Sequence, residues 1–326
     1  MKQLYSILLA LIFWQSNAQS LLIPSANSAF APILEFNTEF VKKQKIRSIT
    51  FDIIDKRDFQ IAEDKNLMNY YEFNKDGLLS RFYYTTIVKT IEKEIHVQPT
   101  YRKKRMIHKG YTYNQNEYVY DTISTVYMYN SNQNLMMKRF NDGTYYETRY
   151  YNYDAKNRVT KEKRFKETNI SETKNTFILG NQTLISADSF QYVDITPTQY
   201  KQICLNSENR TYKEIIVNKD STGKVTSTNE HYTVAWIMQS AEFKYDKGIL
   251  TSAEFKGNAN GDVVLRSTYV CDSTNCIYTE KQFKNDLMLK EISYITERNS
   301  KHLNSFIARD PINKTMRIVK LHYTYY

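Results

Sequence analysis

The feature that most constrains this chain is a recurring unit in which two aromatic residues, two positions apart, precede a short polar turn. Side chains at positions i and i+2 of a strand share a face, so each pair places two rings on one side of a sheet. A strand, an Asx- or Gly-containing turn and a second strand, repeated along the chain, is typical of an antiparallel meander. The clearest copies are Tyr71–Leu78, Tyr127–Asn130, Tyr151–Val159 and Phe243–Ile249.

The distribution of glycine supports the same interpretation. The 326 residues include only eight glycines, most of them beside Asn or Asp, and these residue types tolerate the positive φ of tight hairpin turns. We therefore predict a mainly β protein, an extended antiparallel meander of β-hairpin repeats with one short N-terminal helix. The expected strands lie near residues 49–53, 70–74, 78–90, 117–129, 135–140, 145–153 and 158–166, with a closing strand in 320–326.

The N-terminus is typical of an exported protein. Lys2 precedes an almost unbroken apolar run, Leu4–Trp14, and Ser16–Ala18 offers small residues for cleavage before Gln19. We expect residues 1–18 to be a signal peptide. The mature protein would then reside in the periplasm, at the cell surface or outside the cell.

The remaining chain divides into two parts by its pattern. Residues 19–45 read as an irregular segment with a short helix from Ile33 to Lys43. Residues 46–326 read as one β-repeat sheet domain, with a subdivision, if any, near 193–199.

The chain is basic. Lys and Arg outnumber Asp and Glu by 45 to 35, a formal net charge of +10, which predicts attraction to phosphorylated lipopolysaccharide or acidic polysaccharide if the charge is clustered. We favour the other interpretation, evenly dispersed and solvated charge. Nucleic acid would bind the same charge, but an exported protein rarely meets it, so we expect no nucleic-acid partner.

The densest basic run has two interpretations. We favour an ordinary polar hairpin tip, and the alternative is a binding patch in which basic residues beside tyrosines hold anionic sugars or lipid headgroups by charge and by ring stacking. The neighbouring Tyr-x-Tyr pairs would form an aromatic platform if exposed, or simply core if covered. The residues of the predicted patch are Tyr101, Arg102, Lys103, Lys104, Arg105, Tyr111 and Tyr113.

The cysteines fit an oxidising compartment. Cys271 and Cys276 flank a four-residue loop, and we expect a disulfide between them that clips a hairpin and adds modest stability. Cys204 is expected to be a buried small hydrophobe.

Catalytic and metal-binding patterns are missing from the sequence. The five histidines show no HExxH spacing, and no Gly-x-Ser-x-Gly elbow or glycine-rich phosphate loop is present. We therefore predict no catalytic, cofactor or metal site and a non-enzymatic protein, although an enzyme with scattered residues stays open.

An outer-membrane β-barrel is a further alternative, because the chain is Tyr-rich and ends in an aromatic strand. Lipid-facing positions should be apolar over about 10 residues of each strand. Arg158–Lys166 and Ile277–Ile292 instead carry Lys or Glu on both faces, so we rank this alternative low.

The repeat resembles the tyrosine–aspartate (YD, or RHS-type) repeats of bacterial exported proteins, and also the looser Tyr-rich repeats of uncharacterised exported proteins of Bacteroidota. The segments that carry the resemblance are Arg149–Thr160 and Tyr245–Leu250. It implies a degenerate β-repeat scaffold in the cell envelope and does not imply a toxin.

Three short motifs resemble the Asp-Ser/Thr-apolar sequon of O-glycosylation in Bacteroidota. They would place glycans on Thr122, Ser221 and Ser273. Ordinary Asp-Ser/Thr turn chemistry is the alternative.

Together these features predict a non-enzymatic exported scaffold, an accessory subunit of an envelope or secretion assembly. It would bind a protein partner through a sheet face or an unpaired sheet edge. The alternative is a glycan-binding protein that uses a Tyr platform beside the basic run.

Overall fold

The computed structural model describes residues 20–30, 34–103, 105–141, 145–173, 176–258, 263–271, 277–297 and 302–326. Within them lie one short helix, α2 (Thr38–Lys43), and the strands β1 to β20. The strands are β1 (Ile46–Arg57), β2 (Glu63–Phe73), β3 (Leu79–Val97), β4 (Thr100–Arg102), β5 (Arg105–His108), β6 (Tyr111–Tyr129), β7 (Leu135–Asn141), β8 (Tyr146–Tyr153), β9 (Val159–Asn169), β10 (Leu179–Thr196), β11 (Gln199–Leu205), β12 (Thr211–Lys219), β13 (Val225–Tyr232), β14 (Ile237–Asp246), β15 (Ile249–Gly257), β16 (Val263–Cys271), β17 (Ile277–Lys284), β18 (Leu287–Thr296), β19 (Leu303–Asp310) and β20 (Thr315–Tyr325).

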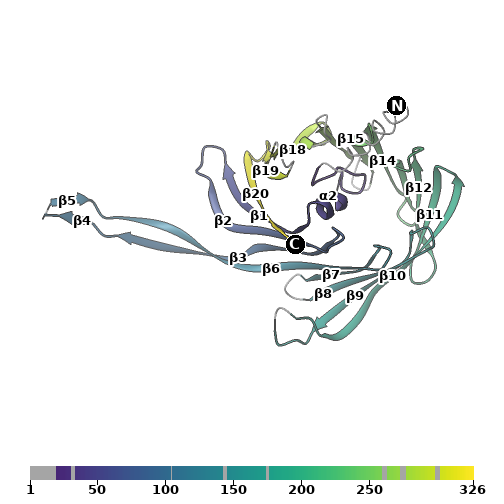
Figure 1. Cartoon of the computed structure of the whole chain (residues 1–326), viewed down its shortest axis with the longest axis horizontal. Helices are drawn as coiled ribbons and strands as arrows, with labels where there is room; N and C mark the ends of the chain where they lie inside the picture. Colours follow the sequence, from purple (N-terminus) through teal and green to yellow (C-terminus); the bar gives the residue numbers. More distant parts are fainter. Residues whose placement is uncertain are drawn as a thin grey trace, which may run out of the picture.

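Eighteen of these strands form one antiparallel sheet that closes on itself. Each strand of the sheet pairs with its neighbours along the chain, and β20 returns to pair with β1 from Ile46/Tyr325 to Arg57/Thr315. Figure 1 shows the resulting ring of strands around α2. The predicted mainly β meander is confirmed, and it is a barrel.

Closure limits where a partner strand could add. A partner was expected to use a sheet face or an unpaired sheet edge, and in the wall β1 has β2 on one side and β20 on the other. The tail in 320–326 does form a closing strand, as predicted, and it occupies the edge that β1 would otherwise expose. A closed barrel leaves no edge in its wall for a partner strand.

Five turns of the wall repeat one geometry. In each, a leading Asn or Asp accepts hydrogen bonds through its side chain from the backbone N–H groups two and four residues later, at 2.8–3.0 Å. The fourth residue has positive φ, which explains why Gly or Asn is common there. These turns span residues 74–78, 130–134, 154–158, 206–210 and 220–224.

One tyrosine of the repeat also has a recurring role. In five places its hydroxyl donates to the carbonyl of the first residue of the adjacent strand, which fixes where that strand begins. The bonds join Tyr129 to Leu79, Tyr153 to Leu135, Tyr192 to Val159, Tyr245 to Val225 and Tyr323 to Leu303, at 2.9, 2.8, 2.8, 2.9 and 2.6 Å.

The inner face of the barrel is packed where the N-terminal segment enters it. Phe40 and Val41 of α2 are buried against Ile49, Phe51 and the facing strands β2 and β18–β20. A second cluster gathers around the fully buried Leu250. The N-terminal segment therefore supplies core that the wall alone would lack.

The helix is shorter than predicted. It begins at Thr38, because the Asn37 side chain accepts a hydrogen bond from the Phe40 N–H at 3.1 Å and caps the first turn. Residues 34–37 are not helical, and Phe36 forms a β-bridge to Leu22. Ile33 lies outside the described residues.

The turn between β2 and β3 packs closely against the N-terminal end of α2. Gly77, in the turn between β2 and β3, has φ +79°, and a Cβ there would lie 2.3 Å from the Thr38 carbonyl oxygen. Lys42 pairs with Asp76 of the same turn at 3.3 Å. This contact explains why the first turn of the repeat has Gly at its fourth position.

The outer face of the wall carries charge. Asp52, between the inward Phe51 and Ile53, pairs with His322 at 2.8 Å. Other outward pairs are Lys201–Glu214, Lys256–Glu254 and Lys281–Glu291, at 2.7, 2.8 and 3.2 Å. The sheet is continuous across residues 193–199, where β10 and β11 pair.

Candidate functional site

Two strands of the barrel continue far outside it. β3 pairs with β2 only through Leu79–Tyr84, and β6 pairs with β7 only through Ser124–Tyr129. Beyond these residues the two strands pair only with each other, as far as Val97 and Tyr111. We call residues 85–123 the arm; Figure 1 shows it projecting from the ring. In the described pairing, both edges of the arm lack a partner strand.

The base of the arm is braced against β2. The Tyr120 hydroxyl donates to the Lys65 carbonyl at 2.7 Å, and the Tyr118 hydroxyl donates to the Glu63 carboxylate. The Lys65 ammonium lies 5.9 Å from the centre of the Tyr118 ring. Because these contacts stop at the base, the distal half of the arm stands free of the barrel.

The arm ends in a small hairpin of its own. β4 and β5 form a separate two-stranded sheet, in which Tyr101 faces Met106 and Arg102 faces Arg105. Pro99 interrupts the long strand because it has no N–H to donate. Gly110 lies opposite, and a Cβ there would be 2.9 Å from the Pro99 side chain and from the Val97 carbonyl oxygen.

The tip is basic without compensation. Residues 95–116 contain five Lys or Arg and no Asp or Glu, so this stretch carries half of the net charge of +10. In the part of the chain that the structure describes, no ion pair involves Arg102, Lys103 or Arg105. The paired charges of the arm lie nearer the barrel, where Lys93 contacts Glu117.

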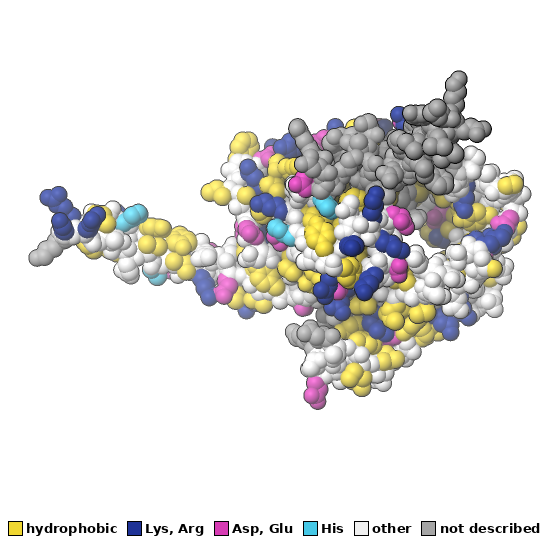
Figure 2. Space-filling view, in the orientation of Figure 1, with side chains coloured by type: hydrophobic (Ala, Val, Ile, Leu, Met, Phe, Trp, Pro, Cys, Tyr) yellow, Lys and Arg dark blue, Asp and Glu magenta, His cyan; other side chains and the backbone are white. Residues whose placement is uncertain are grey.

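The predicted patch residues come together at this tip. Tyr101, Tyr111 and Tyr113 are 58%, 54% and 43% exposed, and the Tyr111 and Tyr113 rings lie 5.9 Å apart. Lys104 lies outside the described residues. Figure 2 shows dark blue Lys and Arg gathered at the end of the arm beside hydrophobic side chains.

Sequence reasoning missed the aliphatic part of the tip. Met106 and Ile107 are 55% and 60% exposed and directly follow the basic run. Their signal was present in the sequence, as two apolar residues inside an otherwise polar hairpin. The sequence does not show that the hairpin stands free of the barrel, so on sequence alone Met106 and Ile107 resemble ordinary strand residues.

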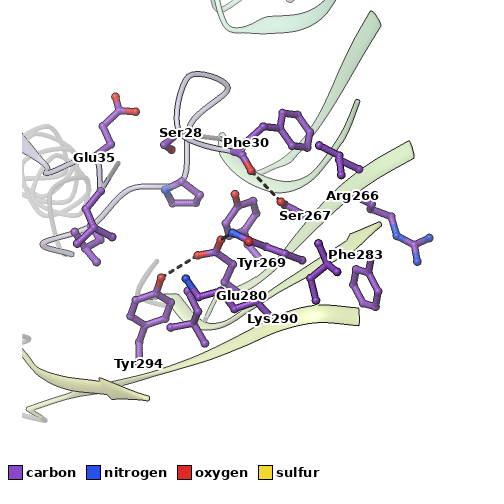
Figure 3. A pocket seen from close by; sticks show the side chains of 18 of the residues that line it. Ser28, Phe30, Glu35, Arg266, Ser267, Tyr269, Glu280, Phe283, Lys290 and Tyr294 are labelled. Carbon is purple, nitrogen blue, oxygen red and sulfur yellow. Dashed lines mark hydrogen bonds between the residues drawn. The ribbon is translucent and has the colours of Figure 1, made fainter. Parts of the chain in front are cut away.

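The barrel interior contains a cavity of about 340 Å³ between the N-terminal segment and β16–β18. Figure 3 shows Tyr294 pointing toward Glu280, to which its hydroxyl donates at 2.9 Å. Gln282 donates to the same carboxylate at 2.7 Å, and Ser267 donates to the Ala29 carbonyl at 2.9 Å. Burial raises the pKa of Tyr294 well above its ordinary value. These polar groups hold each other and join the N-terminal segment to the wall.

A larger space, about 890 Å³, opens beside it. Asp55 and Arg317 face it as a two-point ion pair with distances of 2.8 and 3.1 Å. Glu167 of β9, elsewhere in the wall, is fully buried but accepts hydrogen bonds from Thr148, Arg139 and Gln182. These carboxylates are occupied by structural partners and give no acid–base pair.

Across the described ranges, no group of three or more His, Cys, Asp or Glu side chains could hold a metal ion. No helix in the same ranges is long and apolar enough to cross a membrane.

The remaining site predictions have mixed outcomes. Cys276 and Ser273 lie outside the described residues, so the disulfide with Cys271 and the third glycosylation site stay predictions. Thr122 is exposed on β6 and Ser221 is exposed in the turn 220–224, and glycosylation of either stays a prediction. Cys204 is buried, as expected, and burial raises the pKa of its thiol.

No protein-family profile and no curated protein matches this chain. Among solved structures, a porin-like protein from Bacteroides uniformis is similar over 86% of this chain and 98% of its own, with 10% identity and a TM-score of 0.36. A porin-like protein from Bacteroides vulgatus covers the same shares with 7% identity and a TM-score of 0.33. The crystal structure of TcdB2-TccC3-Cdc42 is similar over 77% of this chain and 12% of that chain, with 11% identity and a TM-score of 0.28. At these values the similarities carry no functional argument.

Proposed function

We propose that this chain is an exported, non-catalytic barrel protein that docks onto an anionic surface of the bacterial cell envelope through its arm. The observation that carries the proposal is the uncompensated positive charge of residues 95–116, held at the end of a ribbon that touches the barrel only at its base. Export rests on residues 1–18, which lie outside the described residues.

The geometry makes the tip an independent electrostatic unit. From Ile87 to Val97 the strand rises about 33 Å at ~3.3 Å per residue. Charges interact in physiological salt over a Debye length of about 8 Å. Acidic residues on the barrel therefore cannot neutralise the tip, which would attract an anionic surface before any other part of the molecule.

Binding of the full chain to an acidic polysaccharide tests this proposal. Polygalacturonate is the probe and neutral dextran the reference. Replacing Arg102 and Arg105 by Gln should weaken binding and reduce its salt dependence. The matched control replaces Lys75 and Arg210, two exposed basic residues on turns of the barrel, by Gln. It should change neither the binding nor its salt dependence. Equal losses in both variants would contradict docking through the arm.

A transmembrane barrel is a second candidate, because the sheet closes and has an even number of strands. The charged side chains of the outer face argue against a transmembrane barrel, because a membrane-embedded wall would place Lys281, Glu291 and Asp52 in lipid. A lysine at the bilayer midplane costs about 2–4 kcal/mol. Extraction of envelope fractions distinguishes the two. Release by alkaline carbonate supports a docked protein, and a requirement for detergent supports a spanning one.

A protein partner stays a prediction. The free edges of the arm are where an extended segment of such a partner would add a strand. A stoichiometric envelope protein that copurifies with the full chain, and is lost when residues 90–118 are replaced by an Asn-Gly turn, would support this role.

A further inference from the structure

We infer that the distal hairpin is a lipid-surface anchor, which inserts its exposed apolar and aromatic side chains into the interface of an anionic bilayer while its Arg and Lys side chains bind the headgroup phosphates. This rests on the proposed function and narrows the anionic surface to a membrane.

The aliphatic side chains of the tip favour lipid over a soluble polyanion. Met106 and Ile107 are more than half exposed at the end of the arm, next to Arg105. A sugar polymer binds through charge, hydrogen bonds and ring stacking, and it offers little hydrocarbon to these two side chains. A bilayer offers both hydrocarbon and phosphate, and burial of such side chains stabilises the bound state.

The distal end of the arm has one apolar face and one polar face. On one face Val97 pairs with Tyr111 and Ile95 pairs with Tyr113, whereas closer to the barrel Ile91 pairs with Glu117. The opposite face is polar over the same length, where His96 pairs with Thr112 and Glu94 with Asn114. An amphipathic ribbon end that also exposes Met106 and Ile107 matches an element that dips into a membrane.

Backbone polar groups without a partner strand limit how deeply the arm can enter a bilayer. The arm is a two-stranded ribbon, and its outer N–H and C=O groups have no partner strand in the described pairing. Such groups cannot enter the hydrocarbon core at a tolerable cost, and a spanning strand needs about 9–11 residues of apolar surface. The tip therefore stops at the interface, the level at which tyrosines are enriched.

Vesicle flotation tests the inference. The full chain is mixed with vesicles of phosphatidylglycerol and phosphatidylcholine in equal parts, and with phosphatidylcholine alone as reference. Each basic residue near an anionic bilayer strengthens binding about fivefold, so replacing Arg102 and Arg105 by Gln should weaken it roughly 25-fold. Replacing Met106 and Ile107 by Ser should weaken it roughly tenfold or more. The control pair at Lys75 and Arg210 should leave it unchanged.

A tryptophan reporter measures insertion directly. Tyr111→Trp places an indole at the tip, and its emission should shift to the blue when anionic vesicles are added. The native Trp236, 79% exposed in the turn between β13 and β14, serves as the internal reference and should not shift. Unchanged thermal unfolding of each variant establishes that its barrel is intact.

The outcomes distinguish the lipid anchor from electrostatic docking alone. Binding that needs both the charged and the aliphatic pair, with a shifted reporter, supports the anchor. Vesicle binding that ignores the Met106 and Ile107 substitutions and disappears at 0.5 M NaCl overturns insertion but keeps electrostatic docking. Binding to polygalacturonate without binding to vesicles also overturns the anchor alone. Failure to bind either probe overturns both proposals.

Discussion

In the barrel wall and in the arm, the same Tyr-x-Tyr pattern has opposite structural outcomes. In the wall, Tyr129 and Tyr153 are half-buried, and their hydroxyls hold the carbonyls of Leu79 and Leu135 at 2.9 and 2.8 Å. In the arm, Tyr111 and Tyr113 expose about half of each side chain to solvent. The residue pattern is shared, so it cannot decide between core and surface.

The difference lies in the number of strands beside each tyrosine. An Asx turn directly follows Tyr129 and Tyr153, so the next strand of the wall pairs with the strand that carries each tyrosine. Each of these tyrosines therefore has a neighbouring strand on both sides. At Tyr111 and Tyr113 the two strands of the arm pair only with each other in the described pairing, so no third strand reaches these rings. A Tyr-x-Tyr pair is therefore core only where the hairpin has neighbours on both sides.

The largest expected difference between wall and arm is in stability. Phe51→Ala removes a fully buried ring that packs on Tyr71 and Phe306, with centroids 4.8 and 5.7 Å apart. It should lower the free energy of unfolding by about 3–5 kcal/mol. Tyr111→Ala in the arm should stay within about 0.5 kcal/mol. Denaturant unfolding followed by circular dichroism measures both, and similar losses would mean that the arm is part of the cooperative unit.

The Asx turns should show the next largest effect. Asn130→Ala removes the acceptor for the backbone N–H groups of Asn132 and Asn134 and should cost about 1.5 kcal/mol. Asn130→Asp keeps the acceptor, as Asp154 does in its own turn, and should remain near the parent. If Asp and Ala cost the same, side-chain capping is not what holds these turns.

Strands and turns were predictable because their signals are local. The strands expected near 70–74, 135–140 and 158–166 correspond to the ends or whole of β2, β7 and β9, since each is bounded by an Asx turn readable from a few residues. Closure was not predictable. It depends on β1 meeting β20 across almost the whole chain, and nothing in either strand identifies the other.

The candidate site was predictable in composition but not in placement. The basic run and its tyrosines were recognised as a hairpin, and the structure brings them to one tip. What the sequence could not provide was the free-standing arm, because β3 was expected to end near residue 90 and β6 to begin near 117. The real strands run to Val97 and from Tyr111, with polar residues such as Glu92, Glu94 and Asn116 that a buried strand would avoid.

Removing a single tyrosine hydroxyl tests the same comparison with a smaller expected change in stability. Tyr153→Phe removes the hydrogen bond to the Leu135 carbonyl while keeping the ring, and should lower the free energy of unfolding by about 1 kcal/mol. Tyr113→Phe, its counterpart in the exposed arm, should have no measurable effect. Chemical denaturation resolves such a difference. A neutral Tyr153→Phe would mean that the ring, and not the hydroxyl, fixes where β7 begins.

The smallest expected effect concerns pH, and it contrasts a hydrogen-bonded carboxylate in the wall with an exposed carboxylate in the arm. Hydrogen bonding from Arg164, aided by Arg149, holds the pKa of the Glu147 carboxyl below its ordinary value. A carboxyl whose pKa is lower in the folded state stabilises the fold above its unfolded pKa, and that contribution is lost as the pH falls through the folded pKa. Glu147→Gln should therefore flatten the acid limb of the stability profile, measured as melting temperature between neutral and acid pH. Glu94→Gln in the arm should leave that limb unchanged, because the Glu94 side chain is 61% exposed and its ion-pair contact, with His96, is long at 3.9 Å.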